Sequence, residues 1–213
     1  MSLKLYLLRH GQTEFSRDNA FCGAGLNPAL TPSGLRMADE FATAYRSTQW
    51  NAVYASPLLR TVSTAKPLCD ALGIQPELRD DLKEIQYGKW EGLTIEAVNR
   101  DFHDDYLRWS ADPAWNAPTG GEPAVAIARR TYRVTEEIRQ RFNDGNILIV
   151  SHKATLRILL CNLLGIDVGR FRYRLACPVA SVSLVEFSQE GPLLHLLADR
   201  SHLSLELRSL PGT

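Results

Sequence analysis

The stretch Leu5-Tyr-Leu-Leu-Arg-His-Gly-Gln-Thr13 begins as an apolar run and ends abruptly in polar residues. Such a run predicts a buried strand, and in open α/β sheets ligands bind at the carboxyl ends of the strands. Arg9 offers a rigid fork of donors to phosphate or carboxylate oxygens. His10 can transfer a proton or attack as a nucleophile, and Gly11 allows a close backbone approach. Taken alone, the stretch is equally consistent with a strand whose polar end simply reaches solvent.

The composition is ordinary for a globular protein and gives no global charge. The 213 residues contain 24 Lys and Arg against 24 Asp and Glu, so the formal net charge is zero. No overall field attracts nucleic acid or an acidic membrane, and no apolar run is long enough to span a bilayer. We therefore expect one domain over residues 1–213, with neither nucleic acid nor a membrane as a partner.

The chain start and the cysteines predict a cytoplasmic protein. Met1-Ser-Leu-Lys4 runs directly into the first strand, which leaves no room for a signal peptide. The four cysteines form no C-x-x-C pair and lack zinc spacing. We expect reduced thiols that mostly pack in the core, and neither a metal nor a cofactor. These cysteines are Cys22, Cys69, Cys161 and Cys177.

Apolar periodicity and capping signals predict alternating strands and helices. Strands are expected at Leu3–Leu8, Ala52–Ala55, Pro76–Leu78 and Asn146–Val150, with a closing pair at Val179–Phe187 and Leu193–Leu197. Helices are expected at Thr31–Ser47, from near Arg60 to Leu72, and at Thr94–Asn99, Glu122–Asn143 and Ala154–Leu164. This alternation favours an α/β fold around a mostly parallel sheet.

Four further segments carry weaker patterns. Gly11–Leu30 is a long polar loop of the functional kind, and residues 101–122 are expected to form an excursion over the active face. Arg170, Arg172 and Arg174 alternate, which is typical of one face of an extended stretch; that face could be a substrate rim, a subunit contact or, by default, a solvated edge. The end of the chain, Leu203–Thr213, is expected to be a loosely held tail. In the helix at Glu122–Asn143, the expected solvated face carries Arg129, Arg130, Arg133 and Arg139.

Charged and titratable groups follow several of these elements. Arg9 and His10 end the first strand, Arg60 opens a helix, and His152 with Lys153 follows the strand at Asn146–Val150. Because parallel strands end at one edge of a sheet, we expect these groups to form an electropositive pocket that suits a phosphoryl group. Glu84 would repel such a guest, but it can donate a proton to a leaving oxygen.

Several separated motifs resemble the histidine phosphatase superfamily, the phosphoglycerate mutase-like proteins. They are Leu8-Arg-His-Gly-Gln-Thr13, Ser56-Pro-Leu-Leu-Arg60, Leu82-Lys-Glu-Ile-Gln-Tyr-Gly-Lys-Trp-Glu-Gly-Leu93 and Val150-Ser-His152. The resemblance covers nearly the whole chain in order. It implies a three-layer α/β/α sandwich with a mostly parallel central sheet. It also implies that His10 is the nucleophile that becomes phosphohistidine, that Glu84 is the acid and base, and that the phosphoryl oxygens are held by Arg9, Arg60 and His152.

The implied reaction agrees with the residues that are present. Phosphoryl transfer needs mainly positioning and stabilisation of charge on the equatorial oxygens. His10 must be neutral to attack, and its cationic neighbours should disfavour its protonated form. A bound phosphate dianion should favour the protonated form of His152. We therefore expect a metal-independent phosphomonoesterase that acts on a small phosphorylated metabolite.

The residues expected to contact the substrate depart in part from the family pattern. Ser16 stands where many members have asparagine, Cys22-Gly23 where Thr-Gly is common, and Lys153 where small residues are usual. Lys153 could contact a second anionic group such as a carboxylate, or it could be an ordinary exposed lysine at a helix start. The full predicted set of substrate contacts is Gln12, Ser16, Cys22, Gly23, Tyr87 and Lys153.

Two other functions fit parts of the pattern. Cofactor-dependent mutases of the family carry Glu-Arg-His-Tyr after the acid, whereas this chain has Glu84-Ile-Gln-Tyr-Gly88, which favours the phosphatase branch. A non-catalytic binder of phosphorylated ligands would need the arginines but neither His10 nor Glu84.

The resemblance also suggests candidate substrates, namely phosphoserine, 3-phosphoglycerate and its sugar conjugates, ribazole phosphates or sugar phosphates. For the assembly, a homodimer is the default expectation.

Overall fold

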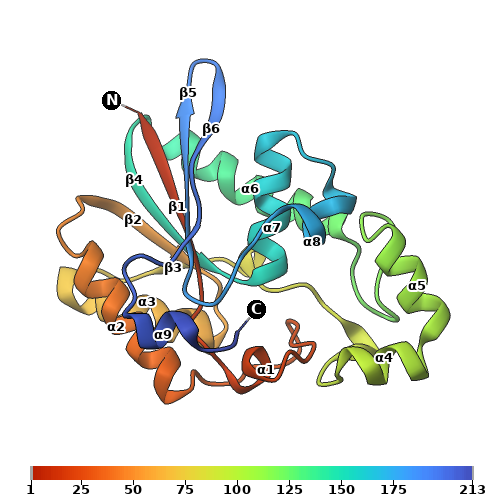
Figure 1. Ribbon diagram of the computed structural model, residues 1–213. Coiled ribbons are helices and arrows are strands. Elements are labelled where there is room, and N and C mark those ends of the chain that lie inside the picture. The colour runs from red at the N-terminus through yellow and green to blue at the C-terminus, as the bar shows by residue number, and fades with distance from the viewer. Residues whose placement is uncertain (1, 213) are drawn as a thin grey trace.

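The computed structural model describes residues 2–212 and is built around a central sheet (Figure 1). Within these residues the sheet has six strands in the order β3-β2-β4-β1-β5-β6. Strands β1, β2, β3 and β4 run parallel, β5 is antiparallel to β1, and β6 is antiparallel to β5. The strand bounds are β1 Leu3–Arg9, β2 Trp50–Ala55, β3 Glu77–Leu78, β4 Gly145–Ser151, β5 Val182–Ser188 and β6 Gly191–Asp199.

Helices cover both faces of this sheet and confirm the predicted three layers. On one face, α6 and α7 pack on the side chains of β1 that alternate with Leu8, such as Leu5 and Leu7. On the other face, α2 and α3 pack on Leu8 and on neighbouring residues of β2 and β4. The helix bounds are α1 Glu14–Arg17, α2 Pro32–Tyr45, α3 Leu59–Leu72, α4 Ile95–Asp101, α5 His103–Ala111, α6 Ala124–Arg141, α7 Lys153–Leu164, α8 Phe171–Arg174 and α9 Leu205–Ser209.

The pairing of β1 with β4 brings the two predicted histidine motifs together. Arg9 lies opposite Ser151 in the parallel register, and the His10 N–H donates to the Ser151 carbonyl oxygen at 3.0 Å. Each strand ends at the same edge, so His10 and His152 leave the sheet as neighbours. Gly11 then passes so close to α2 that a Cβ would lie 2.5 Å from the Gly34 carbonyl oxygen. A side chain at this position would push the loop that follows His10 away from the sheet.

The segment 101–122, predicted to be an excursion over the active face, contains the helix α5. Two predictions about local structure are wrong. The segment with Arg170, Arg172 and Arg174 is helical, because Asp167 caps a 3-10 turn that leads into α8. The tail is held firmly: it includes α9, and its Leu203 and Leu207 are buried in a cluster with Met37, Val179 and Ala180.

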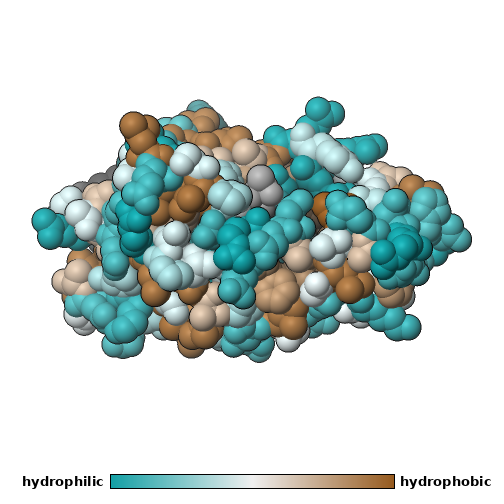
Figure 2. All heavy atoms as spheres, turned by 60° about the horizontal axis from the view of Figure 1, so that its bottom comes forward, coloured by the Kyte–Doolittle hydropathy of each residue, from teal (hydrophilic) through white to brown (hydrophobic). Residues whose placement is uncertain are grey.

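The apolar residues of the structure form neither a membrane-spanning helix within residues 2–212 nor a large patch on the face shown in Figure 2. No helix of residues 2–212 is long and apolar enough to cross a membrane. Figure 2 turns the lower side of Figure 1 forward and shows hydrophilic and hydrophobic residues interspersed over that face. Scattered exposed apolar residues are normal for a globular protein and indicate no docking surface.

Candidate active site

His10 is buried at the end of β1 with its reactive nitrogen defined by one contact. Its Nδ1 lies 2.7 Å from the carbonyl oxygen of Gly11. Because a carbonyl oxygen can only accept, Nδ1 carries the proton and Nε2 keeps its lone pair. Burial, together with the charges of Arg60 and Arg9, holds the pKa of His10 well below its usual value. The side chain is therefore a neutral imidazole with a free nucleophilic nitrogen.

Arg9 and Arg60 reach the same pocket from different elements. Arg9 Nη1 donates to the carbonyl oxygens of Cys177 and Gly212, at 2.6 and 3.0 Å. Arg60, in the first turn of α3, donates through Nη1 to the carbonyl oxygen of Leu26 and through Nη2 to that of Gly23. Burial lowers the pKa of Arg9 to about 10, and it also lowers the pKa of Arg60. Both guanidinium groups thus donate to backbone carbonyl oxygens that hold them in place.

His152 is wholly buried and braces Arg60. The Nε of Arg60 donates to His152 Nδ1 at 3.1 Å, and His152 Nε2 lies 2.9 Å from Ser56 Oγ. Since Nδ1 accepts, the proton sits on Nε2 and the imidazole is neutral. Burial and the charge of Arg60 hold its pKa well below the usual value. If a bound phosphate favoured the protonated form of His152, Arg60 would have to give up its hydrogen bond to His152 Nδ1.

Glu84 is anchored at the N-terminus of α7. Its Oε1 accepts from the N–H of Ile85, the N–H of Thr155 and the Thr155 hydroxyl, at 3.0 to 3.1 Å. Its Oε2 accepts one weaker bond, from the Ala154 N–H at 3.2 Å. The first turn of a helix stabilises an anion by its unpaired N–H groups and its dipole. Oε2 is consequently the oxygen with capacity left for a proton.

The segment that carries Glu84 is held from behind by Arg130 of α6. Arg130 donates to the carbonyl oxygens of Asp81 and Glu84 and forms an ion pair of 2.8 Å with Glu122. Only 12% of its side chain is exposed. The prediction that Arg130 belongs to a solvated face is therefore wrong, because two of its three partners lie 49 and 46 residues away in sequence and are brought close only by the fold.

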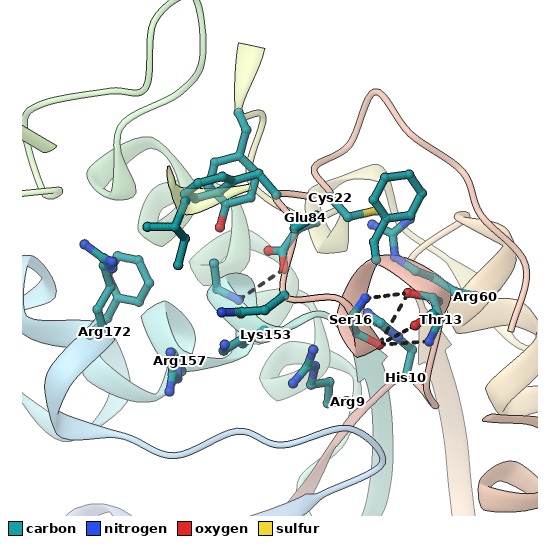
Figure 3. A pocket seen from close by; sticks show the side chains of 18 of the residues that line it. Arg9, His10, Thr13, Ser16, Cys22, Arg60, Glu84, Lys153, Arg157 and Arg172 are labelled. Carbon is teal, nitrogen blue, oxygen red and sulfur yellow. Dashed lines mark hydrogen bonds between the residues drawn. The ribbon is translucent and has the colours of Figure 1, made fainter. Parts of the chain in front are cut away.

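These groups open into one pocket with an empty volume of about 790 Å³ (Figure 3). His10, Arg60 and Ser16 lie on one side of the view, Lys153, Arg157 and Arg172 on the other, and Glu84 between them. This volume includes space that is open to solvent, so it is an upper bound on the room for a ligand. Within residues 2–212, no group of three or more His, Cys, Asp or Glu side chains is arranged to hold a metal ion.

The family assignment follows from comparison with known proteins. A model of the histidine phosphatase superfamily (branch 1) matches residues 5–200. The chain belongs to this superfamily. Membership confirms the resemblance seen in the motifs and, with it, the prediction of an enzyme that hydrolyses phosphate monoesters.

Named relatives of this histidine phosphatase act on small phosphate esters. Phosphoserine phosphatase 1 of Hydrogenobacter thermophilus is 29% identical over 201 residues, which cover 94% of each chain. A bifunctional protein of Mycobacterium tuberculosis is 38% identical over 192 residues, which span 88% of this chain but only 51% of that protein. The structure of mycobacterial glucosyl-3-phosphoglycerate phosphatase is 25% identical, with a TM-score of 0.85, and the match covers 94% of this chain and all of that one.

Most of the predicted site residues of this histidine phosphatase lie on the pocket wall. The wall includes Arg9, His10, Ser16, Cys22, Arg60, Glu84, Tyr87 and Lys153. His152 and Gly23 lie behind it, where Gly23 offers its carbonyl oxygen to Arg60. Gln12 is not on the wall: its amide donates to Pro211 and accepts from Thr31. Gln12 thus ties the tail to α2, and nothing in its contacts points to a substrate.

Sequence reasoning missed part of the opposite wall. Arg157 and Arg172 line the pocket, together with the apolar residues Phe15, Phe21, Ile95, Trp109 and Phe171. Arg157 could have been found, because it follows Lys153 by four residues and therefore shares its helix face. For Arg172 a substrate rim was one of three roles left open by the sequence, and its place on the wall depends on α8 packing beside α7.

Cys22 differs from the other cysteines. It is half-buried on the pocket wall, whereas Cys69, Cys161 and Cys177 are buried, and all four thiols are free. Burial raises the pKa of the Cys22 thiol to about 11. The group is thus a neutral thiol at physiological pH, and it serves as a small wall residue rather than a thiolate nucleophile.

Proposed function

We propose that this histidine phosphatase hydrolyses a small phosphorylated metabolite through a phosphohistidine formed on His10. The observation that carries the proposal is the state of His10, whose Nδ1–H is bound to the Gly11 carbonyl oxygen so that Nε2 is free to attack. A neutral imidazole beside two fixed guanidinium groups suits a phosphoryl group that must be held and attacked at once.

The reaction would have two balanced steps. In the first, His10 Nε2 attacks phosphorus, the bond from phosphorus to the ester oxygen breaks, and Glu84 gives a proton to the departing alcohol. In the second, the Glu84 carboxylate takes a proton from water, the water oxygen attacks phosphorus, and the phosphorus–nitrogen bond breaks. Arg9 and Arg60 would stabilise the charge on the equatorial oxygens in both steps. His152 would act by holding Arg60 in place.

The test is turnover of p-nitrophenyl phosphate in the presence of a chelator, combined with trapping of labelled phosphate on the protein. We expect turnover, and label that is lost in acid and retained in base, as for a phosphoramidate. His10→Ala should abolish both, whereas His103→Ala, a change at an exposed histidine of α5, should abolish neither. Turnover by His10→Ala at the wild-type rate would disprove the proposed nucleophile. Phosphate binding without any turnover would favour the non-catalytic binder.

The assembly and location stay predictions. A homodimer and a cytoplasmic setting were expected from the sequence, and the pocket is built from one chain. Sedimentation of the purified protein at micromolar concentration would decide the assembly.

A further inference from the structure

We propose that the pocket binds a second anionic group of the substrate, at a subsite formed by Lys153, Arg157 and Arg172. The subsite lies on the side of the pocket away from His10 and Arg60 (Figure 3). The inference rests on the proposed function in one respect, namely that the phosphoryl group occupies the His10 end.

The charge of the pocket exceeds what one phosphate ester can balance. Five cationic side chains line it, against the single carboxylate of Glu84, although the whole chain has no net charge. The cations are Arg9, Arg60, Lys153, Arg157 and Arg172. A phosphate monoester brings at most two negative charges. Three of these five, Lys153, Arg157 and Arg172, lie on the other side of the pocket from His10 and Arg60 (Figure 3).

The three cations of the subsite have no carboxylate partner within residues 2–212. Arg157 forms no ion pair, and its Nε is buried without a hydrogen-bond partner. Arg172 lies over the Trp109 ring at 3.9 Å and makes only long contacts, of 3.4 Å, with Ser110 and the Tyr173 hydroxyl. A buried donor without a partner costs free energy unless a ligand satisfies it.

Arginines elsewhere in the chain show the contrast. Exposed arginines such as Arg36 and Arg133 are paired with carboxylates at 2.7 to 2.8 Å. These surface arginines thus have carboxylate partners, whereas Lys153, Arg157 and Arg172 have none within residues 2–212. The three groups are therefore available to an incoming anion.

Repulsion among the three cations also supports a bound anion at the subsite. Lys153 and Arg157 are four residues apart on α7 and lie on one helix face. Burial, with the charges of Arg9 and Arg157, lowers the pKa of Lys153 to about 7. Burial also lowers the pKa of Arg157, and Arg172 adds to this effect. An anion between these groups would relieve the repulsion and restore the charge on Lys153.

The cationic groups of the subsite indicate the class of substrate. It is a short phosphate ester that carries a carboxylate or a second phosphate at its other end. Both groups have oxygens that match a guanidinium fork. The apolar wall, which includes Trp109 and Phe171, leaves room for a carbon skeleton between the two ends.

The test compares esters that differ only in the second anion. The pairs are 3-phosphoglycerate with glycerol 3-phosphate, O-phosphoserine with O-phosphoethanolamine, and propane-1,3-diol bisphosphate with its monophosphate. We expect kcat/KM to favour the doubly anionic member by about tenfold or more, as for charge-assisted contacts. The first two pairs test the carboxylate and the third tests the phosphate, so the pair with the larger ratio identifies the preferred group.

Variants of Arg157 then assign the preference to the subsite. Arg157→Gln should reduce the ratio about tenfold, and Arg157→Lys should restore most of it. Arg139→Gln, a change at an exposed arginine of α6 that is paired with Glu136, should leave the ratio unchanged. Because each ratio is taken within one variant, partial loss of folded protein cancels.

The outcomes separate this inference from the proposed function. Turnover of every ester with ratios near one would overturn the subsite while the phosphatase stands. If no ester is turned over, the proposed function fails, and calorimetric titration with 3-phosphoglycerate and glycerol 3-phosphate still decides the subsite. Tighter binding of 3-phosphoglycerate that is lost in Arg157→Gln would support it, and equal binding of the two esters would overturn it.

Discussion

His10 illustrates how much chemistry depends on one contact at the residue scale. The sequence places an arginine and a histidine after a strand, but it does not say which imidazole nitrogen is free. The 2.7 Å contact of Nδ1 with the Gly11 carbonyl oxygen decides this, since the adjacent residue fixes the tautomer. The same logic applied to His152 gives the opposite tautomer, because Arg60 donates to its Nδ1. Two histidines that resemble each other in sequence therefore carry their protons on different nitrogens.

Glu84 permits a prediction at the same scale. In Glu84→Gln, the amide can keep the three contacts of Oε1, while its NH₂ meets only the Ala154 N–H. The site should therefore stay folded but lose the transferable proton. We expect kcat/KM for alkyl phosphates to fall by about 10²- to 10⁴-fold, and by much less for p-nitrophenyl phosphate, whose leaving group needs no proton. A steady-state comparison of the two esters measures this. Equal losses would remove Glu84 from the acid role.

At the scale of elements, α6 supports the segment that carries Glu84 mainly through Arg130, beside an exposed ion pair from Arg133 to Asp81. Arg130 joins the carbonyl oxygens of Asp81 and Glu84 to the carboxylate of Glu122. Glu122 in turn accepts from the Gln86 N–H. The helix thus fixes the backbone on both sides of Glu84 without touching the pocket, so Arg130 is a positioning residue.

Arg130→Met tests this support. The change leaves Glu122 unpaired in a partly buried place, so we expect the free energy of unfolding to fall by about 1–3 kcal/mol. Because Glu84 loses its backbone anchor, kcat/KM for alkyl phosphates should fall more than for p-nitrophenyl phosphate. Urea unfolding and the two-ester comparison measure the effects. The matched control is Arg133→Met on the same helix, whose exposed ion pair with Asp81 is worth at most about 1 kcal/mol. An identical response of both variants would contradict a special role for Arg130.

The scale of the whole molecule shows which features the sequence can predict. Buried strands are local patterns, so the strand ends that carry His10 and His152 could be located, and parallel strands gather their ends at one edge. The helix at Phe171–Arg174 and the buried tail could not be predicted, since each depends on a partner distant in sequence. Leu207, for instance, is buried in a cluster to which α2 contributes Met37 and the segment before β5 contributes Val179 and Ala180. The role of Arg172 was left open for the same reason.

The tail leads to a prediction about the stability of the whole fold. His202 lies between α2 and the tail, with its ring edge-on to Phe41 and Tyr45 at 5.6 and 5.7 Å between centroids. Burial lowers the pKa of His202 to about 4, although Asp199 and Glu40 oppose this and Arg200 adds to it. Between pH 4 and 6.5 the unfolded chain therefore binds a proton at this residue that the folded chain does not. As the pH falls through that range, this residue should lower the free energy of unfolding by about 1.4 kcal/mol per pH unit.

His202→Phe should remove that part of the acid sensitivity while keeping the aromatic contacts. We expect the free energy of unfolding of the wild type to fall by about 1.4 kcal/mol per pH unit more than that of the variant between pH 6.5 and 4.5. Urea unfolding of both proteins at pH 4.5, 5.5 and 6.5 measures the two slopes, with the exposed His103→Phe as a control for the change in composition. Parallel slopes would mean that His202 binds its proton equally in both states, and the burial of the tail would then have to be far looser than its contacts indicate.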